Sequence, residues 1–249
     1  KLMRETYGSK DPRSEQLRIF VFTAGSSLTA QQPLNNVVRT SIEALAAAMG
    51  GCQTMHVCAF DEALGVPTEA AATLALRTQQ IVAFETGLTD LVDPLGGSEL
   101  LERLTDQLEA EVMAEMDKIA ELGGALACIE SGYFATRLSD SAYETAIAID
   151  TGKRKVVGVN SFVSDTAEFE VFTIDHESEA RQIESLLHVK EKRDQSQVTH
   201  TLEGLSKAAH DGINIVPSVV LAVKAYATVG EITDVLREVY GKWEPTSSF

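Results

Sequence analysis

The chain has 249 residues, of which 44% are hydrophobic and 23% are charged, and its formal net charge at pH 7 is −16. A chain of this length and apolar content can bury a sizeable core, as one large domain or two small ones. The negative charge argues against a nucleic-acid groove or an anionic membrane surface, because both attract clustered Lys and Arg. We therefore expect neither nucleic acid nor a membrane as a partner.

The cysteine content bears on the compartment. Three cysteines occur, Cys52, Cys58 and Cys128, which is an odd number in a chain of this size. Disulfide frameworks use even numbers of cysteines and form in oxidising compartments. We expect reduced thiols and a cytoplasmic location.

The first third of the sequence alternates between strand and helix patterns. Residues 17–23 form a continuous apolar run, as in parallel strands that are covered on both faces. A helix is predicted from Pro33 to the glycine pair at 50–51, a second strand at 54–60, and a second helix from Pro67 to about Thr86. This β-α-β-α order predicts two parallel strands, because a helical crossover returns the chain in the same direction.

The rest of the chain is predicted to be mostly helical. Residues 96–124 contain a long helix that follows Ser98 as its N-cap. Two capping boxes, Ser141 with Glu144 and Thr228 with Glu231, indicate further helix starts. The predicted helices after the first long one lie at about 139–151, 176–192, 196–210, 217–227 and 229–240, and two short strand-like runs lie within 153–174.

The strand count is informative. Two parallel strands do not make a stable sheet, since open parallel sheets need several strands and an eight-stranded βα barrel needs about 250 residues for its units. The missing strands therefore belong to another polypeptide or to a part of the protein outside this sequence.

Asp61 and Glu62 follow the second predicted strand directly. Two readings stay open for this pair. The carboxylates can complement the dipole at the start of the next helix, or one of them can accept hydrogen bonds from a ribose diol, as acidic residues at strand ends do in nucleotide sites. The small, polar loop at 23–33 permits close approach of a ligand to the backbone, but it has neither a GxGxxG nor a GK[ST] pattern.

The histidines suggest structural roles. His56 lies within a predicted strand between apolar neighbours, so we expect a buried, hydrogen-bonded core residue. Cys52, His56 and Cys58 lack the second ligand pair of a structural zinc site, and we predict no metal site. The four remaining histidines are expected on helices as structural or surface residues: His176, His188, His200 and His210.

Several motifs resemble the large subunit of the adenosylcobalamin-dependent acyl-CoA mutases, the methylmalonyl-CoA mutase family. They are the segment 27–69 with "HVCAFDEALGVP", then "DPLGGS", "IESGY", "GVNSF" and "YATVGEITDVLREVYGKWEP". The resemblance runs from Lys1 to about Pro245. It implies an α/β fold in which residues 1–94 are the closing βα units of a TIM (β/α)8 barrel, with its seventh and eighth strands at 17–23 and 54–60. Residues 95–249 would be the last barrel helix and a helical region after the barrel.

The resemblance also implies roles for particular residues. Glu62 of "DEA" would contact the ribose of the adenosyl group, and Gly25 and Gly65 would lie against the cobalamin. Gln53 and Thr54 match positions that approach the coenzyme A part of the substrate. The sequence departs from the family pattern at three positions: Phe22 replaces a frequent Gln, Ser26 an aromatic residue and Cys58 an Asn.

The implied activity is isomerisation of the carbon skeleton of a short acyl-CoA, in which a deoxyadenosyl radical removes a substrate hydrogen and the thioester-bearing group migrates. The cofactor performs that step, and the protein positions it and excludes water. The family's catalytic residues lie in earlier strands, so none is assigned here. The implied partners are a chain with the remaining barrel strands and a small cobalamin-binding subunit, which would share the adenosylcobalamin. The alternative is a non-catalytic scaffold subunit of such a mutase.

Overall fold

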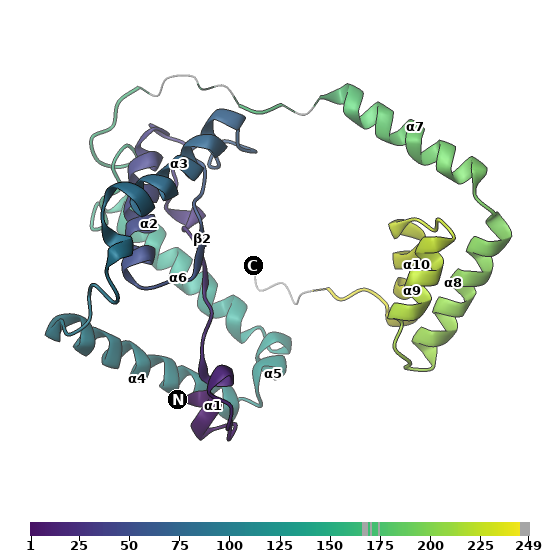
Figure 1. The fold of residues 1–249 in the computed structure, drawn as a ribbon, viewed down its shortest axis with the longest axis horizontal. Coiled ribbons are helices and arrows are strands. Elements are labelled where there is room, and N and C mark those ends of the chain that lie inside the picture. The colour runs from purple at the N-terminus through teal and green to yellow at the C-terminus, as the bar shows by residue number, and fades with distance from the viewer. Residues whose placement is uncertain (166–168, 170, 174, 245–249) are drawn as a thin grey trace. The chain divides into compact units, whose positions relative to one another are not determined.

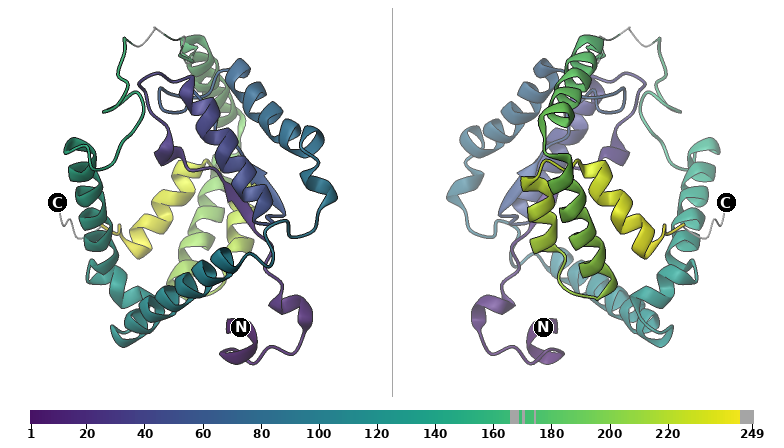
Figure 2. Two further views of the ribbon diagram at one scale, coloured as in Figure 1. Left: turned by 90° about the vertical axis from the view of Figure 1, so that its left-hand side faces the viewer. Right: turned by 90° about the vertical axis from the view of Figure 1, so that its right-hand side faces the viewer.

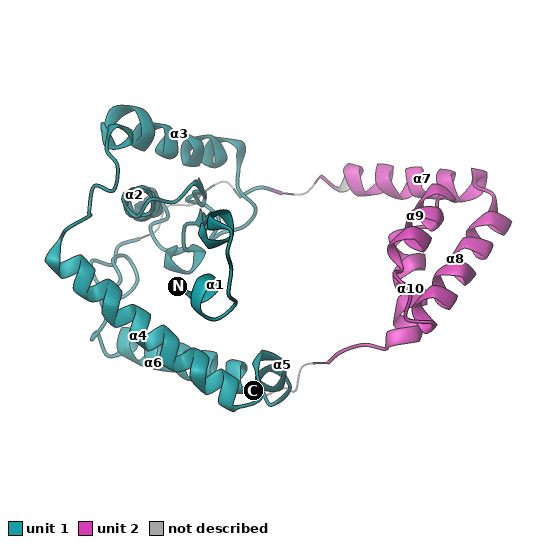
Figure 3. Cartoon of the chain, turned by 60° about the horizontal axis from the view of Figure 1, so that its bottom comes forward, with its two compact units in different colours: residues 1–172, 248 teal, residues 173–247, 249 magenta. Residues whose placement is uncertain are grey.

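The computed structural model of the chain describes residues 1–165, 169, 171–173 and 175–244 (Figure 1). The chain divides into two compact units, residues 1–172 and the residues from Thr173 onward (Figure 3). The first unit holds two strands and six α-helices among its described residues, and the second unit holds four α-helices. The described part of the chain has no helix that is both long and apolar enough to span a bilayer.

The two strands are short and parallel. β1 spans Phe20–Phe22, β2 spans Thr54–His56, and Phe20 pairs with Thr54 in register. The predicted parallel pairing is therefore confirmed, whereas the predicted strand lengths are too long. Within the described residues, β1 pairs only with β2 and the ladder ends after three residue pairs. The fold is α/β in composition, and this two-stranded sheet does not by itself amount to the predicted barrel.

Each strand is followed by a helix. After the short 3-10 helix Gly25–Ser27, helix α2 spans Asn35–Met49 and ends at Gly50. After β2, helix α3 spans Glu69–Glu85, with Thr68 as its N-cap. The buried side chains of this region gather where the two helices meet the segment that follows β2: Ala44, Val57, Cys58, Ala59 and Ala71.

The remainder of the first unit is helical. The elements are α1 (Leu2–Glu5), two 3-10 helices (Pro12–Glu15 and Leu88–Asp90), α4 (Glu99–Glu121), α5 (Ala125–Glu130) and α6 (Tyr133–Asp150). Ser98 is the N-cap residue of α4, although its side chain makes no capping hydrogen bond. Tyr133 joins α6 to α4, because its hydroxyl donates to Glu115 Oε1 at 2.7 Å and its ring lies 5.2 Å from Lys118 Nζ.

Two sequence-based predictions in this region are wrong. α6 begins at Tyr133, so Ser141 and Glu144 lie inside the helix and form no capping box. The first strand-like run, 155–160, is instead a compact turn with an isolated bridge between Val157 and Ser161. Asn160 holds this turn, since its Oδ1 accepts from the amide of Val156 at 2.7 Å. The second run, 168–174, lies partly outside the described residues, and its described members are not in a strand.

The second unit is a set of helices with its own core. α7 spans His176–Lys192, α8 Gln195–His210, α9 Val216–Lys224 and α10 Val229–Tyr240. Helices α8, α9 and α10 pack side by side (Figure 2). Their core consists of buried Leu205, Ala222 and Ile232, with partly buried Leu202, Ile215, Val219, Ala227, Val235 and Leu236 packed against it. The predicted capping box of Thr228 and Glu231 is confirmed at the start of α10.

Candidate functional site

The carboxyl ends of β1 and β2 share one edge of the sheet, because the strands are parallel. The residues that follow the two strands are joined there by hydrogen bonds. The amide of Thr23 donates to the carbonyl oxygen of His56 at 3.0 Å. The amide of Cys58 donates to Thr23 Oγ1 at 2.8 Å, and Cys58 Sγ donates to the Thr23 carbonyl oxygen at 3.1 Å. The two loops that leave this carboxyl edge are thus held at a defined spacing.

Asn36 in α2 holds both loops through its side-chain amide. Its side chain is fully buried. Nδ2 donates to the carbonyl oxygens of Thr29 and Phe60, at 2.9 and 2.8 Å, and Oδ1 accepts from the amide of Thr29 at 3.1 Å. Arg39, one helical turn later, donates to Oδ1 as well at 2.7 Å. A buried amide with all of these partners behaves as a rigid link, because breaking it leaves backbone groups unpaired.

Asp61 is the more deeply buried member of the carboxylate pair, with 4% of its surface exposed. Its Oδ2 accepts from the amide and the hydroxyl of Thr68, at 2.9 and 2.8 Å. Thr68 is the N-cap of α3, so the helix-start reading describes Asp61 well. Its Oδ1 is buried and has no hydrogen-bond partner among the described residues. Such a buried atom is costly to leave unpaired.

Glu62 differs from its neighbour. It is half-buried and lies seven residues before α3 begins, so it does not belong to the helix start. Its Oε1 accepts from the amide of Ala59 at 2.7 Å, which turns the side chain back toward the end of β2. Burial raises the pKa of the Cys58 thiol, and the nearby Glu62 carboxylate raises it further. Glu62 therefore presents a carboxylate at the carboxyl edge, next to a thiol that stays protonated.

The two predicted cofactor glycines differ in the space around them. Gly25 is exposed at the start of the 3-10 helix after β1, and a Cβ added there would meet no atom within 4 Å. The preceding amide, of Ala24, donates to Glu43 Oε2 of α2 at 2.9 Å, which holds the loop. Gly65 is also exposed, but an added Cβ would lie 3.0 Å from Val171 Cγ1. Gly25, Glu62 and Gly65 all belong to the loops that leave the carboxyl edge.

Gln53 and Thr54 lie at the opposite, amino edge of the sheet. Gln53 Oε1 accepts from the amide of Ile19 at 2.6 Å, and its Nε2 donates to the carbonyl oxygen of Gly51 at 2.9 Å. The side chain thus joins the start of β1 to the turn before β2. Both residues line a hollow that also includes residues of α2, α3 and the 3-10 helix Leu88–Asp90. The five predicted site residues therefore fall into two groups, one at each end of the short sheet.

The prediction that His56 is a buried, hydrogen-bonded core residue is wrong. Its side chain is exposed, and its ring stacks on that of Phe22 with 4.4 Å between ring centroids and 24° between ring planes. Strand alternation explains the error, because even-numbered positions of β1 and β2 face away from the helices. His188, His200 and His210 are exposed on α7 and α8, as predicted, while the side chain of His176 lies outside the described part.

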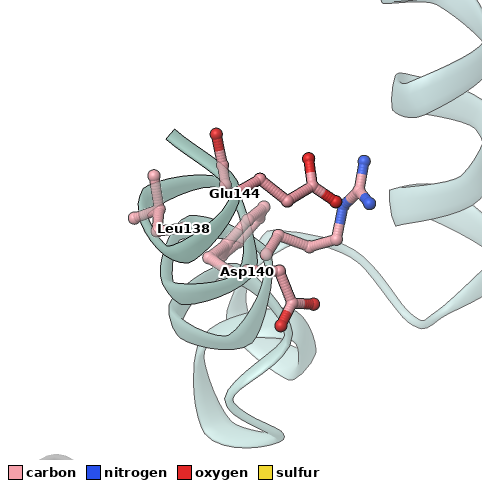
Figure 4. Close-up of a pocket in the computed structure, with 6 residues that line it drawn as sticks. Leu138, Asp140 and Glu144 are labelled. Carbon is pink, nitrogen blue, oxygen red and sulfur yellow. The ribbon is translucent and has the colours of Figure 1, made fainter. Parts of the chain in front are cut away.

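A separate hollow lies on the surface of α6 and contains none of the predicted site residues. It is lined by Phe134, Arg137, Leu138, Asp140, Ser141 and Glu144, all from this one helix. Leu138, Asp140 and Glu144 project from neighbouring turns (Figure 4). Among the described residues, no second element contributes a side chain to this hollow. We therefore place the functional site at the carboxyl edge and not on α6.

Sequence reasoning missed the supporting residues Thr23, Asn36 and Glu43. Asn36 is a polar residue near the start of a predicted helix, but its burial and its bonds to both loops are known only from the structure. Thr23 and Glu43 had no signal in the sequence, because their roles depend on contacts between segments that are distant along the chain.

Comparison with known proteins matches residues 1–242 to the family described as methylmalonyl-CoA mutase. The chain is 39% identical over 252 residues to the 2-hydroxyisobutanoyl-CoA mutase large subunit of Aquincola tertiaricarbonis, covering 100% of this chain and 45% of that protein. It is 41% identical over 239 residues to methylmalonyl-CoA mutase of Escherichia coli (strain K12), covering 95% and 34%. It is 38% identical over 250 residues to the methylmalonyl-CoA mutase large subunit of Streptomyces virginiae, covering 97% and 34%. The chain spans less than half the length of each of these relatives.

Proposed function

The chain belongs to the methylmalonyl-CoA mutase family, and we propose that it is part of an adenosylcobalamin-dependent acyl-CoA mutase. The enzyme would be an isomerase that rearranges the carbon skeleton of a short acyl-CoA. The observation that carries the proposal is the carboxyl edge, where the loops with Gly25 and Glu62 leave adjacent parallel strands. Ligand sites of parallel α/β sheets lie at this end of the strands.

The residues at the carboxyl edge fit the cofactor chemically. Glu62 offers an acceptor-only carboxylate to a ribose diol. A Cβ added at Gly25 would meet no atom within 4 Å, so a flat group can approach the backbone there. We propose that Glu62 holds the ribose and that Gly25 and Gly65 contact the corrin. The cofactor supplies, when bound, the carbon radical that starts the rearrangement.

The substrate proposal concerns the amino edge. We propose that Gln53 and Thr54 approach the coenzyme A part of the acyl-CoA. Thr54 is exposed there, and Gln53 holds the backbone around it in place through its bonds to Ile19 and Gly51. A ligand that reaches both edges would extend along the strands, with its reacting end near Glu62.

The barrel also belongs to this proposal. β1 and β2 are followed by α2 and α3, as in consecutive βα units, and both outer strand edges are unpaired among the described residues. α2 and the residue before it carry an exposed apolar stripe: Leu34, Val38, Ile42 and Leu45. A neighbouring βα unit would cover this stripe and pair the free strand edge. We propose that residues 1–94 close a TIM barrel and that residues 95–249 form its last helix and a helical region, a boundary different from the division at 172.

The proposed partners are a segment or chain with the other barrel strands and a small cobalamin-binding subunit or domain. A cytoplasmic location is also a proposal, supported by Cys52, Cys58 and Cys128, which are all free thiols. The departures from the family pattern at Phe22 and Cys58 are what favours the scaffold alternative, whereas the half-buried Glu62, oriented by its bond to Ala59, supports a role in ligand binding.

The experiment that tests the proposal uses the complete enzyme with a Glu62→Ala substitution. The loss of hydrogen bonds to a charged acceptor should weaken adenosylcobalamin affinity by about tenfold to a hundredfold and lower turnover. Glu85→Ala is the matched control, because Glu85 is an exposed carboxylate at the end of α3. Unchanged affinity and turnover in Glu62→Ala would remove Glu62 from the site and favour the scaffold alternative.

A further inference from the structure

The sheet has a second face that α2 and α3 do not cover. Phe20 and Phe22 of β1 are 61% and 56% exposed, and their partners in register, Thr54 and His56, are exposed on the same face. The alternate residue Met55 is partly buried, as strand alternation requires for the opposite face. The exposed face is thus a continuous surface along the two strands.

Three rings form most of this surface, and we call Phe20, Phe22 and His56 the aromatic wall. Phe22 stacks on His56 at 4.4 Å, and Phe20 meets Phe22 edge to face with 6.5 Å between ring centroids. The three rings therefore form one connected aromatic surface. Exposed aromatic surface of this kind gains free energy when an apolar group covers it.

The wall lies between the two groups of proposed site residues. Gln53 and Thr54 stand at the amino edge, and the loops with Gly25 and Glu62 leave the carboxyl edge. Three strand residues separate these edges, which corresponds to about 10 Å at the usual rise of a strand. A thioester that contacts both edges must therefore cross the wall. This step rests on the proposed function.

The two strands that carry the wall offer no positive charge to an anion. Residues 20–22 and 54–56 include no Lys or Arg, and Arg18 lies before the amino end of β1. The carboxyl edge carries Asp61 and Glu62. A carboxylate on the wall would lose hydration against the rings and would be repelled by these two side chains.

We propose that the aromatic wall contacts the acyl group and selects acyl-CoAs whose acyl group has no free carboxylate. 2-Hydroxyisobutanoyl-CoA and isobutyryl-CoA fit this class, and methylmalonyl-CoA does not. Phe22 is the central specificity-determining residue, since it contacts both other rings.

The test compares these three thioesters with the complete adenosylcobalamin-loaded enzyme. The better of the two carboxylate-free substrates should have a kcat/KM on the order of tenfold or more above that of methylmalonyl-CoA. Phe22→Gln should reduce this ratio by on the order of tenfold, because the amide tolerates a polar acyl group. Titration calorimetry on the enzyme without cofactor gives a second readout. Isobutyryl-CoA should bind more tightly than methylmalonyl-CoA, and Phe22→Gln should reduce the ratio of the two affinities.

Phe84→Gln is the matched control, since Phe84 is 83% exposed on α3 and lies outside the wall. Phe84→Gln should leave unchanged both the ratio of kcat/KM values and the ratio of binding affinities. If methylmalonyl-CoA is turned over at least as well as the carboxylate-free substrates, or if Phe22→Gln leaves both ratios unchanged, the wall does not select the acyl group and only this inference fails. If a preparation that binds adenosylcobalamin turns over none of the three, the proposed function fails and this inference fails with it.

Discussion

Asn36 Nδ2 donates to the carbonyl oxygen of Phe60 at 2.8 Å, across 24 residues of sequence. This bond joins the start of α2 to the segment between β2 and Glu62. The same side chain holds the loop after β1 through Thr29. The spacing of the two loops at the carboxyl edge therefore depends on one buried amide.

Asn36→Ala tests this dependence. The change leaves the amide and carbonyl of Thr29 and the carbonyl of Phe60 without these partners, so the free energy of unfolding should fall by about 2–4 kcal/mol. Urea unfolding of the complete protein measures this loss. Asn35→Ala is the control, because the amide of Asn35 donates to the side chain of Gln32 at 2.9 Å and not to the backbone of either loop among the described residues. This change should cost less than about 1 kcal/mol. Equal losses in both variants would contradict the role given to Asn36.

Gly25→Ala separates ligand contact from folding. An added Cβ meets no atom within 4 Å, and the backbone of Gly25 has no positive φ. The free energy of unfolding should stay within about 0.5 kcal/mol, while adenosylcobalamin affinity should fall about tenfold through overpacking against the ligand. Spectroscopic titration of the cofactor measures the affinity. Gly204→Ala in α8 should leave affinity unchanged, and a similar affinity for Gly25→Ala and the unsubstituted protein would exclude the proposed contact.

Glu231 gives the second unit a pH dependence. Arg193, whose side chain is 4% exposed, donates to both of its carboxylate oxygens, at 2.6 and 2.8 Å. This bonding lowers the pKa of Glu231 from 4.5 to about 2. Because the folded-state pKa is lowered, the stabilisation is complete above pH 4.5 and is lost as pH falls toward 2.

Glu231→Gln should remove that dependence and should lower the free energy of unfolding at neutral pH by about 1–3 kcal/mol. Hydrogen exchange of the backbone amides of α8 and α10, followed across the acid range, reports unfolding of this unit. Glu238→Gln is the control, since Glu238 is exposed on the same helix. A variant that lost stability between pH 4.5 and 2 as steeply as the unsubstituted chain would rule out this ion pair as the source.

The free strand edges predict association. Leu17, Phe20 and Phe22 are 77%, 61% and 56% exposed, and unpaired strands with apolar side chains template further pairing. The isolated chain should self-associate, and native mass spectrometry of material purified gently from its source should show the remaining barrel strands and a cobalamin-binding protein with it. A stable monomer in both preparations would contradict the barrel proposal.

Local patterns predicted the helices well where the end signals lie within a few residues. The boundaries 176–192 and 229–240 agree with α7 and α10, and the capping box at Thr228 is present. The start of α6 was misplaced because Ser141 and Glu144 match a capping box that the helix passes through. Short-range spacing does not distinguish a helix start from a continuing helix.

The amino-acid sequence by itself determined the family, the order of strands and helices, the parallel direction of β1 and β2 and the residues to consider at the carboxyl edge. These follow from periodicity, end signals and motifs, which are local or linear properties. The tertiary structure alone decided that His56 is exposed and stacked on Phe22, that Asp61 and Glu62 have different environments and that Asn36 joins the two loops. Burial and hydrogen bonding between distant segments depend on which surfaces meet, and no short stretch of sequence contains that information.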